Sequence, residues 1–520
     1  MRKNLLSYVL LLALLAGCSS TNNLTTGSRA NLINKDNIRL NLSFLASDEL
    51  EGRETTTHGE QLAALYIKTQ LQRNGVKPFF GDTSFLQPFN VDVSSFDKNS
   101  YFSFTDNTTK KFTFPDDFFI DSRNSSNEVN LTAKVIFAGY GITAPEYKYD
   151  DYAGLDMKGK IVLVMDGEPS GRDSTFFNGD KPSKYSNARE KIQIAKKHGA
   201  AGIITTISKQ YEAKWDFIKR FFERPSYSIA EKKDEKDGNF LSLYVKSSVL
   251  KDLLDGQIYS YDNLSAKAEK GETLPYFDLN GDLKAEVKKN STTKVAKNIV
   301  GVIEGNDPVL KNEYVAVGAH YDHLGIQNGK VYNGADDDGS GTVTVMEVAK
   351  AFAKSRNNKR SILIVFHTGE EKGLLGSSYL TNNLDLIKQN KVVAQVNIDM
   401  VGRESADSIY SIGSDKLSSE MKKVVEEADA ETVKMALDYK YDDPNDPNRF
   451  YYRSDHYNYA KHGIPIVFFF DDMRKDYHRD TDEVDKINFE KLRKIATLVY
   501  SVAGKIANLN HRLVVDKPID

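Results

Sequence analysis

Four apolar runs in the C-terminal half of the chain lead into histidine or acidic residues. The runs are EYVAVGAH, SILIVFHTGEE, KVVAQVNID and GIPIVFFFDD, the last followed a few residues on by His478. Helical segments separate these runs, and such alternation is typical of a mostly parallel sheet flanked by helices. Because sites in such α/β folds form beyond the carboxyl ends of the strands, the polar residues at these ends are candidate site residues.

These strand ends and one glycine-rich loop offer the ligands of a two-metal site. Zinc prefers imidazole and carboxylate when no thiolate is available, and a two-ion hydrolytic site needs a carboxylate that bridges the ions. Taken singly, each candidate has an ordinary structural explanation, but the set together predicts a site for two Zn²⁺ ions. The candidate ligands are His320, Asp337, Glu371, Asp399 and His478.

Two further acidic residues beside these ligands are predicted to support catalysis. In the extended HYD segment, residues i and i+2 point the same way, so Asp322 is expected to accept the imidazole N–H of His320. His323 remains an alternative ligand. The adjacent carboxylates of HTGEE cannot both face one metal, which indicates Glu371 as ligand and Glu370 as the general base for the attacking water.

The loop NGADDDGSG also fits the calcium-binding EF-hand template, counted from Asp336 to Glu347. An EF-hand needs a helix before its first position, whereas the preceding IQNGKVYNGA contains two Asn-Gly turns and no helical period. An apolar stripe that starts at Val343 also begins inside the supposed loop. A catalytic metal is therefore favoured, with a calcium loop and a plain helix-entry turn capped near Ser340 as alternatives.

The N-terminus, MRKNLLSYVLLLALLAGCSS, is typical of an export signal. Its apolar run is shorter than the roughly 20 residues of a membrane-spanning helix. The LLAGCSS ending resembles a bacterial lipobox, which predicts lipidation of Cys18, the only cysteine. The lipid is expected to anchor the exported protein in the bacterial cell envelope, at the outer membrane or a periplasm-facing membrane. An ordinary signal with an incidental cysteine is the alternative.

Composition shifts along the chain predict two folded modules behind this leader. A β-rich stretch interrupts the α/β pattern and is expected to form a separate module. The expected divisions are the signal and lipobox at 1–18, a flexible tether at 19–34, an N-terminal part of the main domain at 35–100, the insert at 101–275 and the catalytic part at 276–520. The formal net charge of −3 leaves no basic surplus, so no nucleic-acid partner is expected.

Other catalytic schemes lack their motifs, because neither H-E-x-x-H nor G-x-S-x-G occurs in the chain. The motifs GAHYDHLG, NGADDDGSG, HTGEEKGLLGSSY, VNIDMVGR, RSDHYNYAKHGIPIVFF and DYHRDTDEVDKI instead stand in the order seen in a known family. The chain resembles the two-zinc exopeptidases that include bacterial aminopeptidases, aminopeptidase Y and glutamate carboxypeptidase II. Its early LASDELEGRETTTHGEQLAALYI resembles the N-terminal helix region of the same family.

This resemblance implies a zinc-exopeptidase fold with a protease-associated (PA) domain as the insert. It also implies Asp337 as the bridging ligand and Glu370 as the base. The expected activity is that of an aminopeptidase acting on peptides, with a carboxypeptidase or dipeptidase, a glutaminyl cyclase-like enzyme and a non-catalytic receptor-like protein as alternatives. A carboxypeptidase would need an arginine for the terminal carboxylate, for which Arg403 and Arg453 are the candidates.

Overall fold

The computed structural model describes residues 32–81, 83–122, 124–169, 176–179, 181–230 and 239–519. The expected signal and Cys18 lie outside these residues, as does nearly all of the expected tether. The chain divides into two compact units. The first consists of Met1–Phe89 with Val295–Asp520, and the second is Asn90–Lys294.

The second unit extends beyond the expected 101–275 range on both sides, because its limits, Asn90 and Lys294, fall inside two long strands. They are β2 (Leu86–Phe96) and β13 (Tyr276–Ile303). The early part of β13 pairs with strands of the second unit, and its last residues pair with β17 (Ser361–His367) of the first unit. The pairing of the strands therefore locates the limits of the insert more precisely than the change in composition along the chain.

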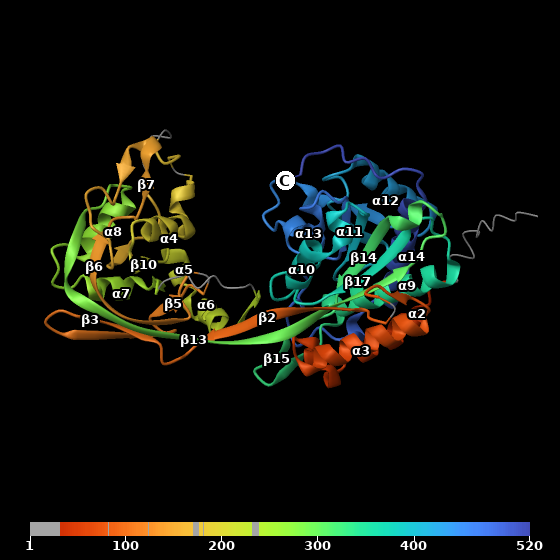
Figure 1. Ribbon diagram of the computed structural model, residues 1–520, viewed down its shortest axis with the longest axis horizontal. Coiled ribbons are helices and arrows are strands. Elements are labelled where there is room, and N and C mark those ends of the chain that lie inside the picture. The colour runs from red at the N-terminus through yellow and green to blue at the C-terminus, as the bar shows by residue number, and fades with distance from the viewer. Residues whose placement is uncertain are drawn as a thin grey trace, which may run out of the picture. The chain divides into compact units, whose positions relative to one another are not determined.

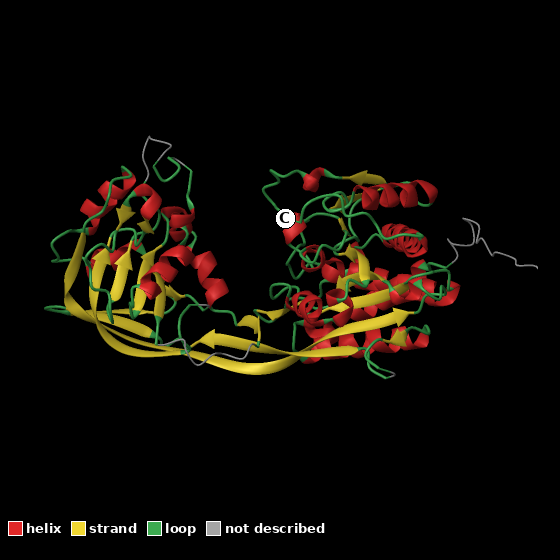
Figure 2. Cartoon of the chain, turned by 45° about the horizontal axis from the view of Figure 1, so that its top comes forward, coloured by secondary structure: helices red, strands yellow, loops and turns green. Residues whose placement is uncertain are grey.

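The first unit is built on a sheet whose centre is parallel (Figures 1 and 2). Its central order is β17, β14, β18, β21, with every neighbouring pair parallel. β19 joins β21 antiparallel, and β13 joins β17 antiparallel at the other side. The remaining strand bounds are β1 Lys77–Pro78, β14 Tyr314–His320, β15 Gly325–Gln327, β16 Lys330–Tyr332, β18 Val392–Ile398, β19 Ser408–Ile412, β20 Ala436–Asp438 and β21 Ile466–Phe470.

Alternate residues of these strands enter two different cores, one on each face of the sheet. In β17, Ile362, Ile364 and Phe366 belong to one core, while Leu363 and Val365 belong to the other. Both sets are fully buried, which explains why the sequence shows continuous apolar runs in place of a polar alternation. The predicted α/β class, a mostly parallel sheet flanked by helices, is confirmed.

Helices cover both faces of this sheet (Figure 1). The first core receives apolar residues of α2, α3, α9, α12 and α14, and the second receives those of α10, α11 and α13. Helix α3 covers His58–Arg73. The other bounds are α2 Lys35–Leu45, α9 Gly341–Ser355, α10 Leu375–Asn383, α11 Asp385–Lys388, α12 Ser419–Glu431, α13 His456–Ala460 and α14 Phe489–Asn508.

The second unit has its own sheet and core, as the predicted insert requires. Strands β6, β9, β10 and β12 pair in parallel in that order, and antiparallel strands flank them. An aromatic-rich core, including Phe102, Phe118 and Phe137, lies within this unit. The bounds are β3 Tyr101–Thr105, β4 Thr109–Thr113, β5 Phe118–Ile120, β6 Glu128–Ala138, β7 Thr143–Ala144, β8 Tyr149–Asp150, β9 Ile161–Val164, β10 Gly202–Thr206, β11 Ser226–Ile229, β12 Leu241–Val245, α4 Ala188–Lys197, α5 Lys209–Glu212, α6 Trp215–Phe222, α7 Ser247–Leu253 and α8 Tyr261–Glu269.

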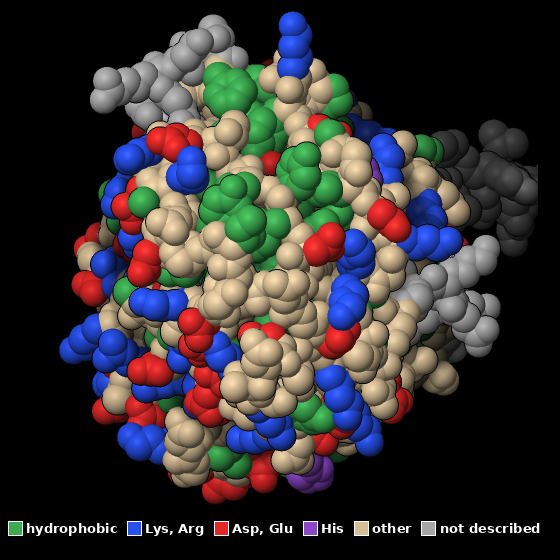
Figure 3. All heavy atoms as spheres, turned by 90° about the vertical axis from the view of Figure 1, so that its left-hand side faces the viewer, with side chains coloured by type: hydrophobic (Ala, Val, Ile, Leu, Met, Phe, Trp, Pro, Cys, Tyr) green, Lys and Arg blue, Asp and Glu red, His purple; other side chains and the backbone are tan. Residues whose placement is uncertain are grey.

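Basic and acidic side chains are interspersed on the face drawn in Figure 3, around a group of apolar side chains. Within the described part of the chain, no helix combines the length and apolar character needed to span a membrane.

Candidate metal centre

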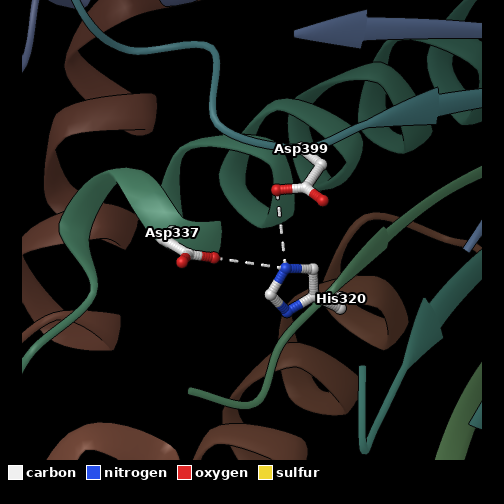
Figure 4. Close-up of side chains that lie close together, drawn as sticks. All are labelled: His320, Asp337 and Asp399. Carbon is white, nitrogen blue, oxygen red and sulfur yellow. Dashed lines mark ion pairs between the residues drawn. The ribbon is translucent and has the colours of Figure 1, made fainter. Parts of the chain in front are cut away.

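The carboxyl ends of the parallel strands bring the predicted ligands together at one edge of the sheet. His320 is the last residue of β14, Asp399 follows β18, and Asp337 lies in an irregular helical turn, Ala335–Ser340, before α9. His320 Nε2 lies 3.4 Å from Asp337 Oδ1 and 3.5 Å from Asp399 Oδ1 (Figure 4). These three buried side chains form a first cluster that could hold a metal ion.

A second cluster forms on the other carboxylate oxygen of Asp337. His478 Nε2 lies 3.2 Å from Asp337 Oδ2 and 3.1 Å from Glu371 Oε2. His323, the alternative ligand, also enters this cluster, with Nδ1 2.8 Å from Glu371 Oε1 and 3.9 Å from Asp337 Oδ2. The two oxygens of Asp337 therefore face two different sets of donors, as a bridging carboxylate between two ions must.

Several buried nitrogen and oxygen atoms that could bind a metal in the two clusters have no hydrogen-bond partner among the described residues. A buried polar atom without a partner costs about 1–3 kcal/mol, so such atoms rarely gather in one place without a function. Carboxylate and imidazole are ligands that suit zinc, so the donor set fits this metal. The atoms are His320 Nε2, Asp337 Oδ2 and His323 Nε2, while His323 Nδ1 and Glu371 Oε1 lie 2.8 Å apart without hydrogen-bond geometry.

The carboxylates make the centre strongly negative, and the pKa values of its groups follow from that field. Burial opposes protonation of His478, yet Glu371 and Asp337 raise its pKa to about 10. Burial likewise opposes protonation of His320, but the charges of Asp399 and Glu370 raise its pKa well above the usual value. A site that holds protons this firmly attracts metal cations for the same electrostatic reason.

The neighbours of Asp337 each bind backbone N–H groups through one carboxylate oxygen. Asp336 Oδ1 accepts the Gly402 N–H at 2.7 Å, and Asp338 Oδ1 accepts the N–H groups of Gly341 and Met400 at 2.9 and 3.1 Å. The Asp482 carboxylate accepts the N–H groups of both Asp336 and Asp337. Of the three adjacent aspartates, Asp337 is the one whose carboxylate lies against His320 and His478.

The calcium-loop alternative is wrong. The segment before the loop contains the short strand β16, where an EF-hand would have a helix. Glu347, the expected bidentate ligand, accepts the N–H of Asn34 at 2.7 Å and the Lys350 ammonium, also at 2.7 Å. The stripe that starts at Val343 is buried in the core of the unit.

Asp322 supports His320 in a different way from the one predicted. His320 Nδ1 lies 3.1 Å from the Asp322 backbone oxygen, whereas the nearer carboxylate oxygen is 3.7 Å away. The carboxylate instead accepts the Thr55 hydroxyl at 2.7 Å and the Glu370 N–H at 3.2 Å. The extended geometry brings residue i+2 to the ring, but the backbone oxygen takes the bond.

Glu370 lies at the first cluster, with Oε2 3.8 Å from His320 Nε2. Its side chain is 13% exposed, so it borders the space next to the clusters and is not sealed beneath them. Burial raises its pKa well above the usual value, and the charges of Asp399 and Glu371 raise it further. A carboxyl in this position can take a proton from a neighbouring water and pass it on.

A small cavity of about 40 Å³ adjoins the centre. Asp337, Glu370 and His478 form one side of it. Its other lining residues are mainly apolar and include Met400, Phe450, Phe468 and Phe470. Of the two arginines considered for a terminal carboxylate, Arg453 lines this cavity, whereas Arg403 is buried in ion pairs with Asp482 and Asp336.

Reasoning from strand ends missed the side chains that hold the centre from other parts of the fold. They include Arg53, Thr55 and Asp482. The GR pair in LEGRET and the aspartate-rich HRDTDEV were visible in the sequence. No periodicity or spacing, however, links residues so far apart along the chain.

Comparisons with known proteins agree with this arrangement. Residues 298–503 match the model of Peptidase family M28, and residues 130–230 match that of the PA domain. The chain is 33% identical over 187 residues to a "probable leucine aminopeptidase 2" of Aspergillus oryzae, covering 35% of each chain. It is 28% identical over 268 residues to "Leucine aminopeptidase 2" of Trichophyton rubrum, covering 46% of this chain and 51% of that protein.

Among solved structures, the "Aminopeptidase from Aneurinibacillus sp. strain AM-1" is similar with a TM-score of 0.57 at 20% identity, covering 95% of this chain and 99% of that one. This likeness shows the fold. The chain spans only about a third to a half of the length of the two curated relatives.

The α/β fold and the paired clusters of histidine and carboxylate define a protein with a candidate two-metal centre at the carboxyl ends of its parallel strands. Residues 298–503 are similar to peptidase family M28, and residues 130–230 are similar to the PA domain. The predicted family resemblance is thereby confirmed.

A buried ion pair beneath the centre generates a stability prediction. Lys491 Nζ lies 2.6 Å from Asp471 Oδ1 and donates to the Arg403 carbonyl, and neither side chain of the pair is appreciably exposed. Lys491→Met should leave Asp471 buried and unpaired and lower the free energy of unfolding by about 3–5 kcal/mol. Denaturant unfolding followed by circular dichroism measures the loss.

Lys494→Met, on the same helix, is the matched control, because its partner Asp407 is 79% exposed. We expect it to change stability by less than about 1 kcal/mol. Burial already raises the pKa of Asp471 to about 6, and a protonated carboxyl needs no counter-charge, so the Lys491→Met loss should be smaller at pH 5 than at pH 8. Equal losses for both variants would contradict the prediction.

Proposed function

We propose that this protein is a zinc-dependent aminopeptidase that holds two Zn²⁺ ions and releases N-terminal residues from peptides. The observation that carries the proposal is the pair of donor clusters sharing Asp337. His320 and Asp399 would complete one ion's ligands, and Glu371 and His478 the other's, with His323 beside the second set. The family match and the names of the relatives support the same activity.

When bound, the metal pair would supply Lewis acidity to the scissile carbonyl and lower the pKa of water towards neutrality. The residues of the chain do the rest. Glu370 takes the proton of the attacking water and passes it to the leaving amine. Its partial exposure lets it reach the substrate side of the centre, while Asp322 fixes its backbone N–H.

The cavity supports recognition of an apolar first residue. Met400, Phe450, Phe468 and Phe470 would contact the side chain, and the carboxylates beside them would attract the free ammonium group. A carboxypeptidase or dipeptidase would need an arginine to bind the terminal carboxylate. Arg453 lines the same cavity, so this alternative is tested as well. Two complete clusters favour hydrolysis over a single-zinc cyclase or a receptor that has lost its ligands.

Matched peptides test the activity. We expect the protein to release leucine from peptides with a free N-terminus, to leave N-acetylated versions intact, and to lose activity in a chelator and regain it with Zn²⁺. Amidation of the C-terminus should have little effect on turnover, because the free ammonium is the recognised end. Cleavage of acetylated peptides only when their carboxyl end is free would assign the activity to a carboxypeptidase. Full activity after metal removal would refute the metal mechanism.

Two conservative variants separate the base from the bridging ligand. Glu370→Gln should retain zinc but lower kcat by about 10²–10⁴-fold, because it removes the proton acceptor. Asp337→Asn should instead lose zinc, because one neutral amide cannot bridge two cations. Metal analysis of the purified proteins together with steady-state kinetics gives both readouts. Near wild-type turnover in Glu370→Gln would reject its assignment as the base.

We also propose that Cys18 anchors the protein to a bacterial envelope membrane. The lipobox-like LLAGCSS supports this, since it places the single cysteine where lipidation occurs. In cells labelled with radioactive palmitate, the wild-type chain should incorporate label and sediment with membranes, and Cys18→Ser should do neither. Export of an unlabelled wild-type chain would show that the segment is an ordinary signal.

A further inference from the structure

The segment Gly52–Thr55 precedes α3 and makes contacts with loops that lie more than 250 residues later in the chain. Arg53 is 1% exposed, although arginine is rarely buried in proteins. Its guanidinium donates four hydrogen bonds, all to backbone carbonyls. The acceptors are Tyr321 at 2.9 Å, Leu45 at 2.6 Å, Asn333 at 2.6 Å and Gly334 at 3.0 Å.

Three of these carbonyls belong to the loops that carry metal-ligand candidates. Tyr321 directly follows His320, and Asn333 and Gly334 lead into the turn that carries Asp337. One planar guanidinium therefore spans the loop after β14 and the loop before α9. Its N–H groups point in fixed directions, so it sets the distance between those loops, which a flexible ammonium group could not do.

Two more contacts of the same segment reach the centre. The Thr55 hydroxyl donates to Asp322 Oδ2 at 2.7 Å, and the other oxygen of that carboxylate accepts the Glu370 N–H. The His323 N–H donates to the Arg53 carbonyl at 3.1 Å. The segment thus contacts the loop of the first ligand directly and is linked to the loop of the proposed base through Asp322.

Gly52 allows this close approach. It has a φ of 66°, and a Cβ atom at this position would lie 2.4 Å from the Tyr332 carbonyl oxygen and 2.8 Å from that of Gly325. Any side chain would therefore push the segment away from the loops. The Gly-Arg pair is a local requirement of this packing.

The charge of Arg53 also acts on the centre. Burial lowers its pKa, while the carboxylates of Asp482, Asp322, Asp337 and Asp338 oppose that shift. The guanidinium is therefore a fixed cation among the acidic groups that surround the clusters. It reduces their mutual repulsion without occupying either cluster.

We propose that Arg53 is a positioning residue of the metal centre, which sets the separation of His320 and Asp337 through the backbone of their loops, with Thr55 fixing Asp322. This inference rests on the proposed function, because it assumes that the two clusters hold metal ions. Removal of a supporting group outside the ligand set typically weakens metal binding 10- to 100-fold. We expect a loss of that size when Arg53 is replaced.

A second buried arginine separates positioning from general stabilisation. Arg360 is also 1% exposed. It donates to the carbonyls of Ile506, Leu509 and His511 and pairs with Glu313, none of which belongs to the centre. A purely structural role for Arg53 predicts that Arg53→Lys and Arg360→Lys have the same consequences.

The experiment compares the full-length wild-type protein with Arg53→Lys and Arg360→Lys. Zn²⁺ affinity is measured against a competing chelator, and the visible absorption of the Co²⁺-loaded proteins reports the geometry of the metal ligands. Both variants should unfold at lower denaturant concentration. Only Arg53→Lys should weaken Zn²⁺ binding by about 10- to 100-fold, alter the Co²⁺ spectrum and lower kcat more than it raises KM.

The outcomes distinguish this inference from the function on which it rests. Wild-type affinity and an unchanged Co²⁺ spectrum in Arg53→Lys would overturn the positioning role and leave the metallopeptidase proposal intact. Failure of the wild-type protein to bind Zn²⁺ would overturn both. If Arg53→Lys does not fold, Thr55→Val replaces it, since it removes one hydroxyl of similar shape; an unchanged spectrum and affinity in that variant would then overturn the inference.

Discussion

The burial of many carboxylates in one small region is the constraint on which the rest of the first unit depends. Asp336, Asp337, Asp338, Asp399 and Asp482 are all buried at one edge of the sheet. Ionised carboxylates at such spacing repel one another and lose their hydration, so each needs a cation or several N–H donors. These carboxylates can be buried together only if each has a cation or hydrogen-bond donors close to it.

The structure divides the compensation among three kinds of partner. Backbone N–H groups donate hydrogen bonds to two of the carboxylates: Gly402 donates to Asp336, and Met400 donates to Asp338. Arg403 pairs with Asp482, and Lys491 pairs with Asp471. The oxygens of Asp337 face the histidines His320, His478 and His323. Asp337 is therefore the bridging candidate for two reasons. Its oxygens face the histidines, and the adjacent aspartates accept hydrogen bonds from backbone N–H groups.

The sequence predicts those features that arise from local pattern and strand direction. Parallel strands end at the same edge, so apolar runs ending at His320 and Asp399 were enough to predict that these side chains meet. Helix α3 has such a local pattern too, because its apolar period is followed by the stop signals Gly75 and Pro78. The role of the Asp322 backbone oxygen could not be predicted, because choosing between a carbonyl and a carboxylate 3.1 and 3.7 Å from the ring requires coordinates. His323 stayed an open alternative for the same reason.

The contacts of Arg53 show why the remaining features could not be predicted, and also how the chain tolerates its insert. Arg53 and Tyr321 are 268 positions apart, so no window of sequence contains both, and the whole second unit lies between them. Closing such a loop adds only about 0.6 kcal/mol for each doubling of its length. Because the second unit has a core of its own, most of the intervening chain is ordered independently. A short segment before a large insert can therefore serve the metal centre, provided that a few strong contacts, here the four bonds of one guanidinium, hold it there.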